Sequence, residues 1–177
     1  MLARTADTAQ VDDGVPWEKL SPFTVRRLVA LATTSPGSYR ALVGAFRPIH
    51  SVLLPAFRDL LVSDALNRNE GHTAASIIGE YAVDQPLYLC DLVPELLPEQ
   101  YAMILPHLKN CRKLANERFS SILAERSDAA ADQTQKDELV ARKAIAAVTL
   151  LHLNDEPVGV WPLFRQSPDT NQRTGLI

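Results

Sequence analysis

Glycine and cysteine are both scarce in this chain of 177 residues, which contains only 7 glycines and 2 cysteines. Average proteins carry roughly 7% glycine, so little of the residue that builds tight β-turns is available here. No run of 18 apolar residues occurs, and residues 1–14 lack the apolar centre of a signal peptide. These absences argue against an all-β fold and a membrane-spanning helix, and we expect a cytoplasmic chain.

Neither acidic nor basic residues dominate the sequence. The chain has 18 basic and 21 acidic residues, a net charge of −3, and 6% aromatic residues. A nucleic-acid-binding domain usually presents a basic stripe, which this sequence lacks. The two thiols, Cys90 and Cys111, are expected to be reduced and to lie partly buried as small apolar side chains.

Apolar residues recur at helical spacing along most of the chain. The first stripe follows the i, i+3, i+4, i+7 pattern and consists of Val25, Leu28, Val29 and Ala32. Its helix should begin with Ser21 as N-cap and Pro22 in the first helical position. We expect further short amphipathic helices at residues 38–47, 48–62, 67–83, 86–92, 98–109, 111–125, 132–153 and 158–166, and another that begins after Ser167.

Local signals refine these boundaries. Proline removes a helical hydrogen bond and clashes with the preceding turn, so we expect a break at Pro48 and a milder bend at Pro55. Residues 127–131 read as a loop. Asp132 and Gln135 have the spacing of a capping box for the longest helix. Glu138 and Arg142, four residues apart in that helix, should form an ion pair.

The stripes also predict a core. In the fourth helix the pattern is Ala74, Ile77, Ile78 and Tyr81, and in the longest helix it is Val140, Ala144, Ala147, Val148 and Leu151. We expect eight core side chains to be mostly buried: Ile77, Ile78, Tyr81, Phe119, Ile122, Ala147, Val148 and Leu151.

Two helical segments resemble each other, residues 73–81 and 143–151, at an offset of 70 residues or about two repeats of 35. After the second come Val160-Trp161-Pro162-Leu163-Phe164, Ser167-Pro168-Asp169, Arg173 and Leu176-Ile177. This order resembles HEAT repeats. It implies an all-α fold of stacked antiparallel helix pairs, a HEAT-like α-solenoid fragment.

We expect a flexible lead-in at 1–20 and a helical-repeat domain at 21–177. Because the last helix has barely begun, that domain should be truncated.

A wider resemblance extends over residues 38–177. It rests on Ala45-Phe46-Arg47-Pro48-Ile49, Ala74-Ala75, Glu80-Tyr81-Ala82, Asp84, Pro86, Tyr101, Leu105-Pro106, Val160-Trp161-Pro162-Leu163, Ser167-Pro168-Asp169 and Arg173. These residues resemble the helical region of planctomycete-type multidomain proteins. Such proteins join a serine/threonine protein kinase domain to a formylglycine-generating-enzyme (sulfatase-modifying factor) type domain. The quoted motifs are packing and turn signatures. The resemblance implies a larger signalling-type parent protein, whether cytoplasmic or membrane-anchored.

Candidate catalytic and metal-binding residues are few. The sequence has no G-x-G-x-x-G, P-loop, H-R-D, C-x-x-C or H-E-x-x-H motif. His107 and Cys111 stand four apart, but a zinc site needs three or four protein ligands, and Asn110 should end the helix between them. The other histidines, His50, His72 and His152, read as helix-surface or helix-end residues.

The remaining polar and aromatic candidates have simpler interpretations. The carboxylate pairs Glu80/Asp84 and Glu95/Glu99 read as solvated faces and caps, and Ser120 and Ser121 have no base nearby. The aromatic residues Tyr101, Trp161 and Phe164 read as core. The basic cluster of Arg26, Arg27, Arg40 and Arg47 offers at most a modest surface for an acidic partner. We therefore predict no catalytic, cofactor-binding or metal-binding residue and no cofactor.

Two functions stay open. The first is a non-catalytic helical-repeat scaffold or interaction module whose partners are protein domains of the same or another chain. The alternative is a nucleic-acid-binding HEAT-like repeat, which would need a basic concave face with interleaved aromatic residues. The net negative charge and the low aromatic content count against this alternative. We predict no small-molecule ligand and no enzymatic activity.

Overall fold

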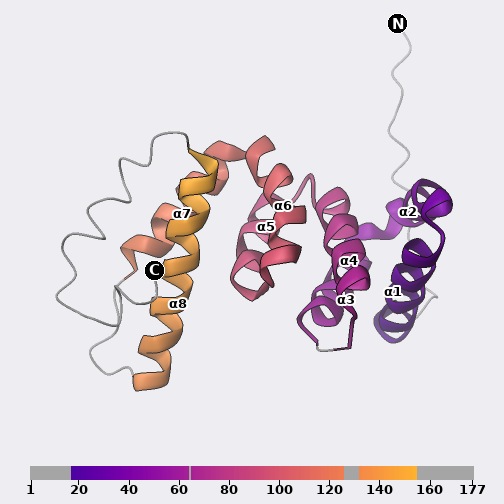
Figure 1. Ribbon diagram of the computed structural model, residues 1–177, viewed down its shortest axis with the longest axis horizontal. Coiled ribbons are helices and arrows are strands. Elements are labelled where there is room, and N and C mark those ends of the chain that lie inside the picture. The colour runs from indigo at the N-terminus through magenta and orange to yellow at the C-terminus, as the bar shows by residue number, and fades with distance from the viewer. Residues whose placement is uncertain (1–16, 64, 126–131, 155–177) are drawn as a thin grey trace, which may run out of the picture. The chain divides into compact units, whose positions relative to one another are not determined.

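The computed structural model describes residues 17–63, 65–125 and 132–154, and within these ranges every regular element is a helix (Figure 1). The α-helices are α1 (Trp17–Thr34), α2 (Tyr39–Phe46), α3 (His50–Val62), α4 (Arg68–Tyr81), α5 (Pro86–Leu92), α6 (Pro98–Asn110), α7 (Arg112–Ala124) and α8 (Gln133–Leu153). Short 3-10 helices occur at η1 (Pro36–Ser38), η2 (Arg47–Ile49) and η3 (Val93–Glu95). The all-α prediction is confirmed. The expected helices beyond residue 154 and the loop at 127–131 lie outside the described residues.

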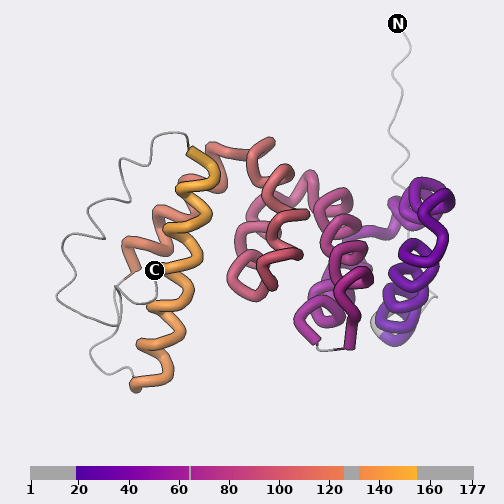
Figure 2. The backbone as a smooth tube through the Cα atoms, in the orientation of Figure 1, coloured from indigo at the N-terminus to yellow at the C-terminus, as the bar shows by residue number. Residues whose placement is uncertain are grey.

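The chain divides into two compact units. Unit 1 contains α1 to α4 and the start of α6, Pro98–Met103. Unit 2 contains α5, the rest of α6, α7 and α8. The smooth tube in Figure 2 follows these helices in chain order.

The start of the first helix differs from the prediction. Helix α1 begins at Trp17, four residues before the expected N-cap Ser21, and Pro22 lies inside it. A proline this near a helix start removes one hydrogen bond, and the core contacts of the same helix can offset that cost. Ser21 is only 6% exposed. It therefore takes part in packing rather than capping a helix end in solvent.

Other boundary signals are confirmed. Pro48 falls in η2, so the chain breaks between α2 and α3 as expected, whereas Pro55 lies inside α3. The Asp132–Gln135 capping box opens α8. A second capping box, which we did not predict, opens α4. There the Asn67 side chain accepts from the Glu70 amide, and the Glu70 carboxylate accepts from the Asn67 amide.

In unit 1, helix α3 packs against both α1 and α4. The predicted α1 stripe is confirmed, since Val25, Leu28, Val29 and Ala32 are at most 3% exposed. His50 at the start of α3 lies against Tyr81 at the end of α4, so these helices run antiparallel. The core of this unit therefore forms where the stripes of α1, α3 and α4 meet.

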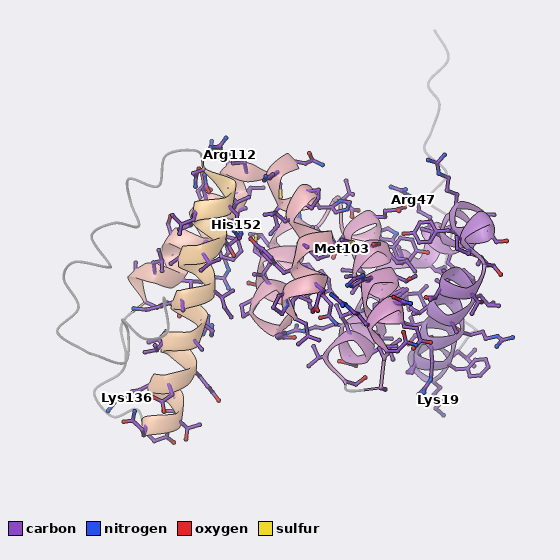
Figure 3. The ribbon with its side chains drawn as sticks, in the orientation of Figure 1. Lys19, Arg47, Met103, Arg112, Lys136 and His152 are labelled. Atoms are coloured by element: carbon purple, nitrogen blue, oxygen red, sulfur yellow. The ribbon has the colours of Figure 1, made fainter. Side chains whose placement is uncertain are left out.

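In unit 2, α7 and α8 form an antiparallel pair. Arg112 at the start of α7 bonds to Asn154 just after α8, and Glu125 just after α7 pairs with Arg142 within α8. Figure 3 places Lys136 and His152 at opposite ends of α8, with Arg112 near His152. We expected Arg142 to pair with Glu138; its partner in the structure is Glu125.

The predicted core is largely correct but wrong on one side of α8. Ile77, Ile78, Tyr81, Phe119, Ile122 and Ala147 are at most 2% exposed. Val148, however, is 40% exposed, and Leu151 is only half-buried. Besides the predicted Ala144 and Ala147, the residues buried on α8 are Ala146, Thr149, Leu150 and Leu153. Apolar residues occur on every side of this part of α8, so their spacing in the sequence did not identify the side that faces α7.

Candidate functional site

A shallow groove lies on unit 1 between the first half of α1 and the second half of α3. It encloses about 380 Å³ and is lined by Pro22, Phe23, Arg26, Ala56, Asp59 and Leu60. Sites that hold small molecules or anchoring side chains typically enclose about 300–1,000 Å³, so this groove could take one or two side chains of a partner.

An exposed aromatic residue, Phe23, is among those that line the groove. Phe23 is 73% exposed, and Leu20, one turn earlier, is 42% exposed. The stripe Val25–Leu28–Val29 faces the core, so Phe23 occupies a position that the helical pattern assigns to solvent. An aromatic residue in such a position costs solubility unless another surface covers it.

Charged groups of both signs stand beside this ring. Arg26 from α1 and Asp59 from α3 both line the groove. An apolar centre with charged neighbours has the composition of a small protein interface, in which polar groups at the edge set orientation. Such a site can bind a partner but offers no nucleophile with an adjacent base.

A second cluster of polar residues gathers at the end of α4 in unit 1. The Tyr39 hydroxyl donates to the Glu80 carboxylate at 2.9 Å, and the Tyr81 hydroxyl donates to the Val43 carbonyl at 2.9 Å. The His50 Nδ1 donates to the Arg47 carbonyl at 2.8 Å, and its Nε2 lies 3.6 Å from an Asp84 oxygen. The structure thus brings His50, Glu80 and Asp84 into one neighbourhood.

The tyrosines of this cluster are held in their neutral form. Burial, followed by the nearby Glu80 charge, raises the pKa of Tyr81 to about 12. Burial and then the hydrogen bond to Glu80 raise the pKa of Tyr39 as well. A phenol with a raised pKa is a poor general base at neutral pH, since a catalytic group works best with a pKa near the operating pH. The cluster therefore fits a structural role that ties α2 to α4.

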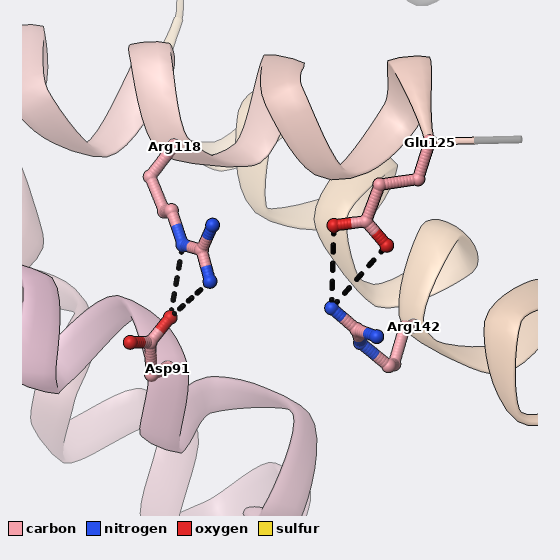
Figure 4. A network of polar contacts seen from close by, with 4 residues as sticks. All are labelled: Asp91, Arg118, Glu125 and Arg142. Carbon is pink, nitrogen blue, oxygen red and sulfur yellow. Dashed lines mark hydrogen bonds and ion pairs between the residues drawn. The ribbon is translucent and has the colours of Figure 1, made fainter.

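In unit 2, two ion pairs involve the α7 region (Figure 4). The Nε and one terminal nitrogen of Arg118 both reach the same Asp91 oxygen, at 2.9 and 2.8 Å. Arg142 reaches the Glu125 carboxylate at 3.4 Å. Partly exposed pairs of this kind contribute roughly 0–1 kcal/mol each. They fix the α5–α7 and α7–α8 contacts rather than form a reaction centre.

The two thiols are free. Cys90 is fully buried, and Cys111, the residue before α7, is half-buried. Burial is the main cause that raises the pKa of Cys90 to about 12 and also raises the pKa of Cys111. A thiol with a raised pKa holds little thiolate and is a weak nucleophile or metal ligand.

The metal pair considered in the sequence is not assembled as a site. Helix α6 ends at Asn110, as expected, and the Cys111 thiol donates a hydrogen bond to the His107 carbonyl oxygen at 3.4 Å. Across the described residues, no group of three or more His, Cys, Asp or Glu side chains could hold a metal ion.

The other sequence candidates stay apart or serve as local contacts. Glu99 pairs with Arg68 at 3.2 Å, Glu95 lies in η3, and Ser120 and Ser121 are exposed on α7. The four arginines, Arg26, Arg27, Arg40 and Arg47, are all exposed on α1, α2 and η2. Tyr101 is half-buried on α6, and His152 is exposed on α8, whereas Trp161 and Phe164 lie outside the described residues.

One histidine differs from its expected setting. The sequence predicts a surface or helix-end position for His72 in α4, but its Nε2 atom is buried, and no described residue forms a hydrogen bond with that atom. Nearby, Gly71 lets α4 approach α6 closely, because a Cβ at this position would lie 3.2 Å from the Gln100 side-chain nitrogen. Sequence spacing missed this close approach, as it missed the groove at Phe23.

Comparisons with known proteins add no family to this description. No protein-family model matches the chain, and neither a curated protein nor a solved structure matches it. In the part of the chain that the structure describes, no helix is long and apolar enough to cross a membrane.

Proposed function

We propose that this chain is a non-catalytic helical scaffold that binds a partner protein through the α1–α3 groove. The observation that carries the proposal is the 73% exposure of Phe23 within an apolar groove. Aromatic residues are enriched at the centres of protein interfaces and often dominate their binding energy.

The lining of the groove supports a partner of one particular chemistry. Its volume of about 380 Å³ suits one or two aliphatic or aromatic side chains. Arg26 and Asp59 would pair with an acidic and a basic residue that flank this anchor on the partner. A short amphipathic segment of a protein domain has this combination of groups.

The resemblance to kinase and formylglycine-generating-enzyme multidomain proteins supports a protein domain as that partner. In such an arrangement a helical region lies between catalytic domains and can hold them at a fixed spacing. We infer that the partner is a protein domain of the same or another chain of a signalling-type assembly.

A photo-crosslinking amino acid placed at position 23 tests the proposal. Irradiation in the native host should link one protein to this position, and that protein is then identified and purified. Its affinity for the full chain is measured by calorimetry. Phe23→Asp should weaken binding at least about tenfold, since central interface residues typically contribute 1.4 kcal/mol or more.

A matched control separates this effect from general loss of apolar surface. Leu87 on α5 is 51% exposed and lies in unit 2, so Leu87→Asp should leave the affinity unchanged. Equal affinities of the wild-type and Phe23→Asp chains for the purified partner would refute the docking role. So would the absence of any specific cross-link at position 23.

A further inference from the structure

The α1–α3 groove carries one charge of each sign that the chain itself leaves unpaired. Arg26 on α1 and Asp59 on α3 are both exposed, and both line the groove. Among the described residues, neither side chain takes part in an ion pair. Arg68, by contrast, is more than two-thirds exposed and still pairs with Glu99 at 3.2 Å. The two charges at the groove are therefore available to a partner.

Exposed apolar side chains extend the groove along both helices. Leu20 lies one turn before Phe23 on α1 and is 42% exposed. Val62 lies one turn after Asp59 on α3 and is 50% exposed. Residues three or four apart lie on the same side of a helix, so these side chains belong to one surface with the groove. We call this surface the groove face, and it consists of Leu20, Phe23, Arg26, Asp59 and Val62.

We propose that the partner is a second copy of this chain, docked groove to groove about a twofold axis. This pairing rests on the docking role of the groove proposed above, and it adds the identity of the occupant. The groove suits an apolar anchor that is flanked by an acidic and a basic residue. Its own lining presents that same combination as Phe23, Asp59 and Arg26.

The two signs of charge are what favour a second copy. In a symmetric dimer, a contact from one residue to another is repeated in the opposite direction. Arg26 of each copy then meets Asp59 of the other copy, so one complementary pair becomes two. Each Phe23 ring is covered by the groove of the other copy. A face with charges of one sign only would repel its own copy across such an axis.

The size of the groove face predicts a weak dimer. Helix α1 has 18 residues and α3 has 13, so they are about 27 and 20 Å long at 1.5 Å per residue. Packed helices lie about 8–10 Å apart, so one side of this pair is smaller than the roughly 800 Å² that each partner buries in a standard interface. Interfaces of smaller area are typical of transient complexes. We therefore expect dissociation constants between the micromolar and the millimolar range.

Charge-swap variants of the full chain test this pairing. Sedimentation equilibrium between about 1 µM and 1 mM should show that the wild-type chain is in exchange between monomer and dimer. Arg26→Asp alone and Asp59→Arg alone should each weaken the dimer at least about tenfold, because each places like charges opposite each other twice. An equimolar mixture of the two variants should regain most of the lost affinity, since every pair across the mixed dimer again has opposite signs.

A matched control and a second set of variants keep the result interpretable. Arg40→Asp on α2 makes the same charge change outside the groove face and should leave the dimer unchanged. Circular dichroism verifies the fold of each variant, and Arg26→Glu and Asp59→Lys are used should the first pair unfold. A chain that stays monomeric over this range would overturn the pairing. So would a dimer that ignores both charge variants, or a mixture that regains no affinity.

The photo-crosslink at position 23 separates a failure of this pairing from a failure of the docking role. A monomeric chain that cross-links specifically to a different protein would overturn the second copy as the partner and would leave the docking role of the groove in place. A monomeric chain that gives no specific cross-link would overturn both. A homodimer cross-linked through position 23 in the purified chain would support both.

Discussion

Tyr81 connects three parts of unit 1 through one side chain. Its ring packs edge-on against Phe57 with centroids 5.9 Å apart, and it also lies 6.1 Å from the His50 ring. Its hydroxyl donates to the Val43 carbonyl on α2. At 2% exposure, neither the ring nor the hydroxyl has ready access to water as an alternative partner. A single residue thus links α2 and α3 to the end of α4.

The pH dependence of stability should reveal this residue. The pKa of Tyr81 is raised to about 12 from the ordinary 10, so the folded chain holds the phenolic proton more tightly than the unfolded chain. Its stabilising contribution is complete below pH 10 and disappears as the pH rises through about 12.

We expect Tyr81→Phe to lower the free energy of unfolding at pH 7 by about 1 kcal/mol, through the lost hydrogen bond. The same variant should lose less stability than the wild type between pH 10 and pH 12. Urea titrations of both chains at several pH values measure this difference. Parallel pH profiles for the two chains would contradict the assigned role.

At the scale of the element, the capping boxes of α4 and α8 fix where these helices begin. In each box a side-chain oxygen accepts from the backbone amide three residues on, and the side chain there accepts from the cap amide in return. Two of the unpaired amides at each helix start are therefore satisfied.

We expect Asn67→Ala to destabilise the chain by about 1 kcal/mol, the usual cost of losing an N-cap side chain. Asn67→Asp keeps the acceptor and adds a negative charge at the helix start, where the helix dipole favours it. This second variant should be at least as stable as the wild type. Thermal unfolding followed by circular dichroism compares the three chains, and equal melting temperatures for Asn67→Ala and wild type would refute the capping role.

The helices differ in how well the sequence predicts them. The α1 stripe has polar residues between its apolar ones, so Val25, Leu28 and Val29 mark the buried side without ambiguity. In α8, residues 144–151 are apolar or small on every side, so the spacing of apolar residues does not mark one side of the helix as buried. Val148 was for this reason assigned to the core. The positions of α7 and η3 decide which side of α8 is covered.

The groove could not be predicted, because it depends on residues far apart in the chain. Phe23 and Asp59 are brought together by the packing of α1 on α3. The Tyr39–Glu80 bond likewise joins residues 41 positions apart. The one local signal was an apolar residue, Phe23, at a position that the helical pattern assigns to solvent.

At the scale of the whole molecule, the charge distribution separates the two functions considered above. The net charge is −3, and the exposed arginines Arg26, Arg27, Arg40 and Arg47 are distributed over α1, α2 and η2. Tight duplex binding requires several phosphate contacts from a continuous basic surface.

We therefore expect the chain to bind duplex DNA no more tightly than ordinary non-specific contact, with Kd about 10⁻⁴–10⁻⁶ M at physiological salt. Fluorescence anisotropy of a labelled duplex at two salt concentrations measures this affinity. Sub-micromolar binding with a steep salt dependence would instead favour a nucleic-acid-binding repeat.

The hydrogen-bonded pair of Asn116 on α7 and Asn154 just after α8 bears on which substitutions these two positions tolerate. Asn116 and Asn154 each donate an amide hydrogen to the other's carbonyl oxygen, at 2.9 and 3.0 Å. Replacing Asn154 removes both of these bonds from the Asn116 amide. Replacing Asn116 leaves Asn154 still accepting from Arg112 at 3.3 Å and donating to the Leu150 carbonyl at 2.8 Å. Substitution at position 154 should therefore be tolerated less well than substitution at position 116, although the two residues, 38 positions apart, form the same pair of bonds.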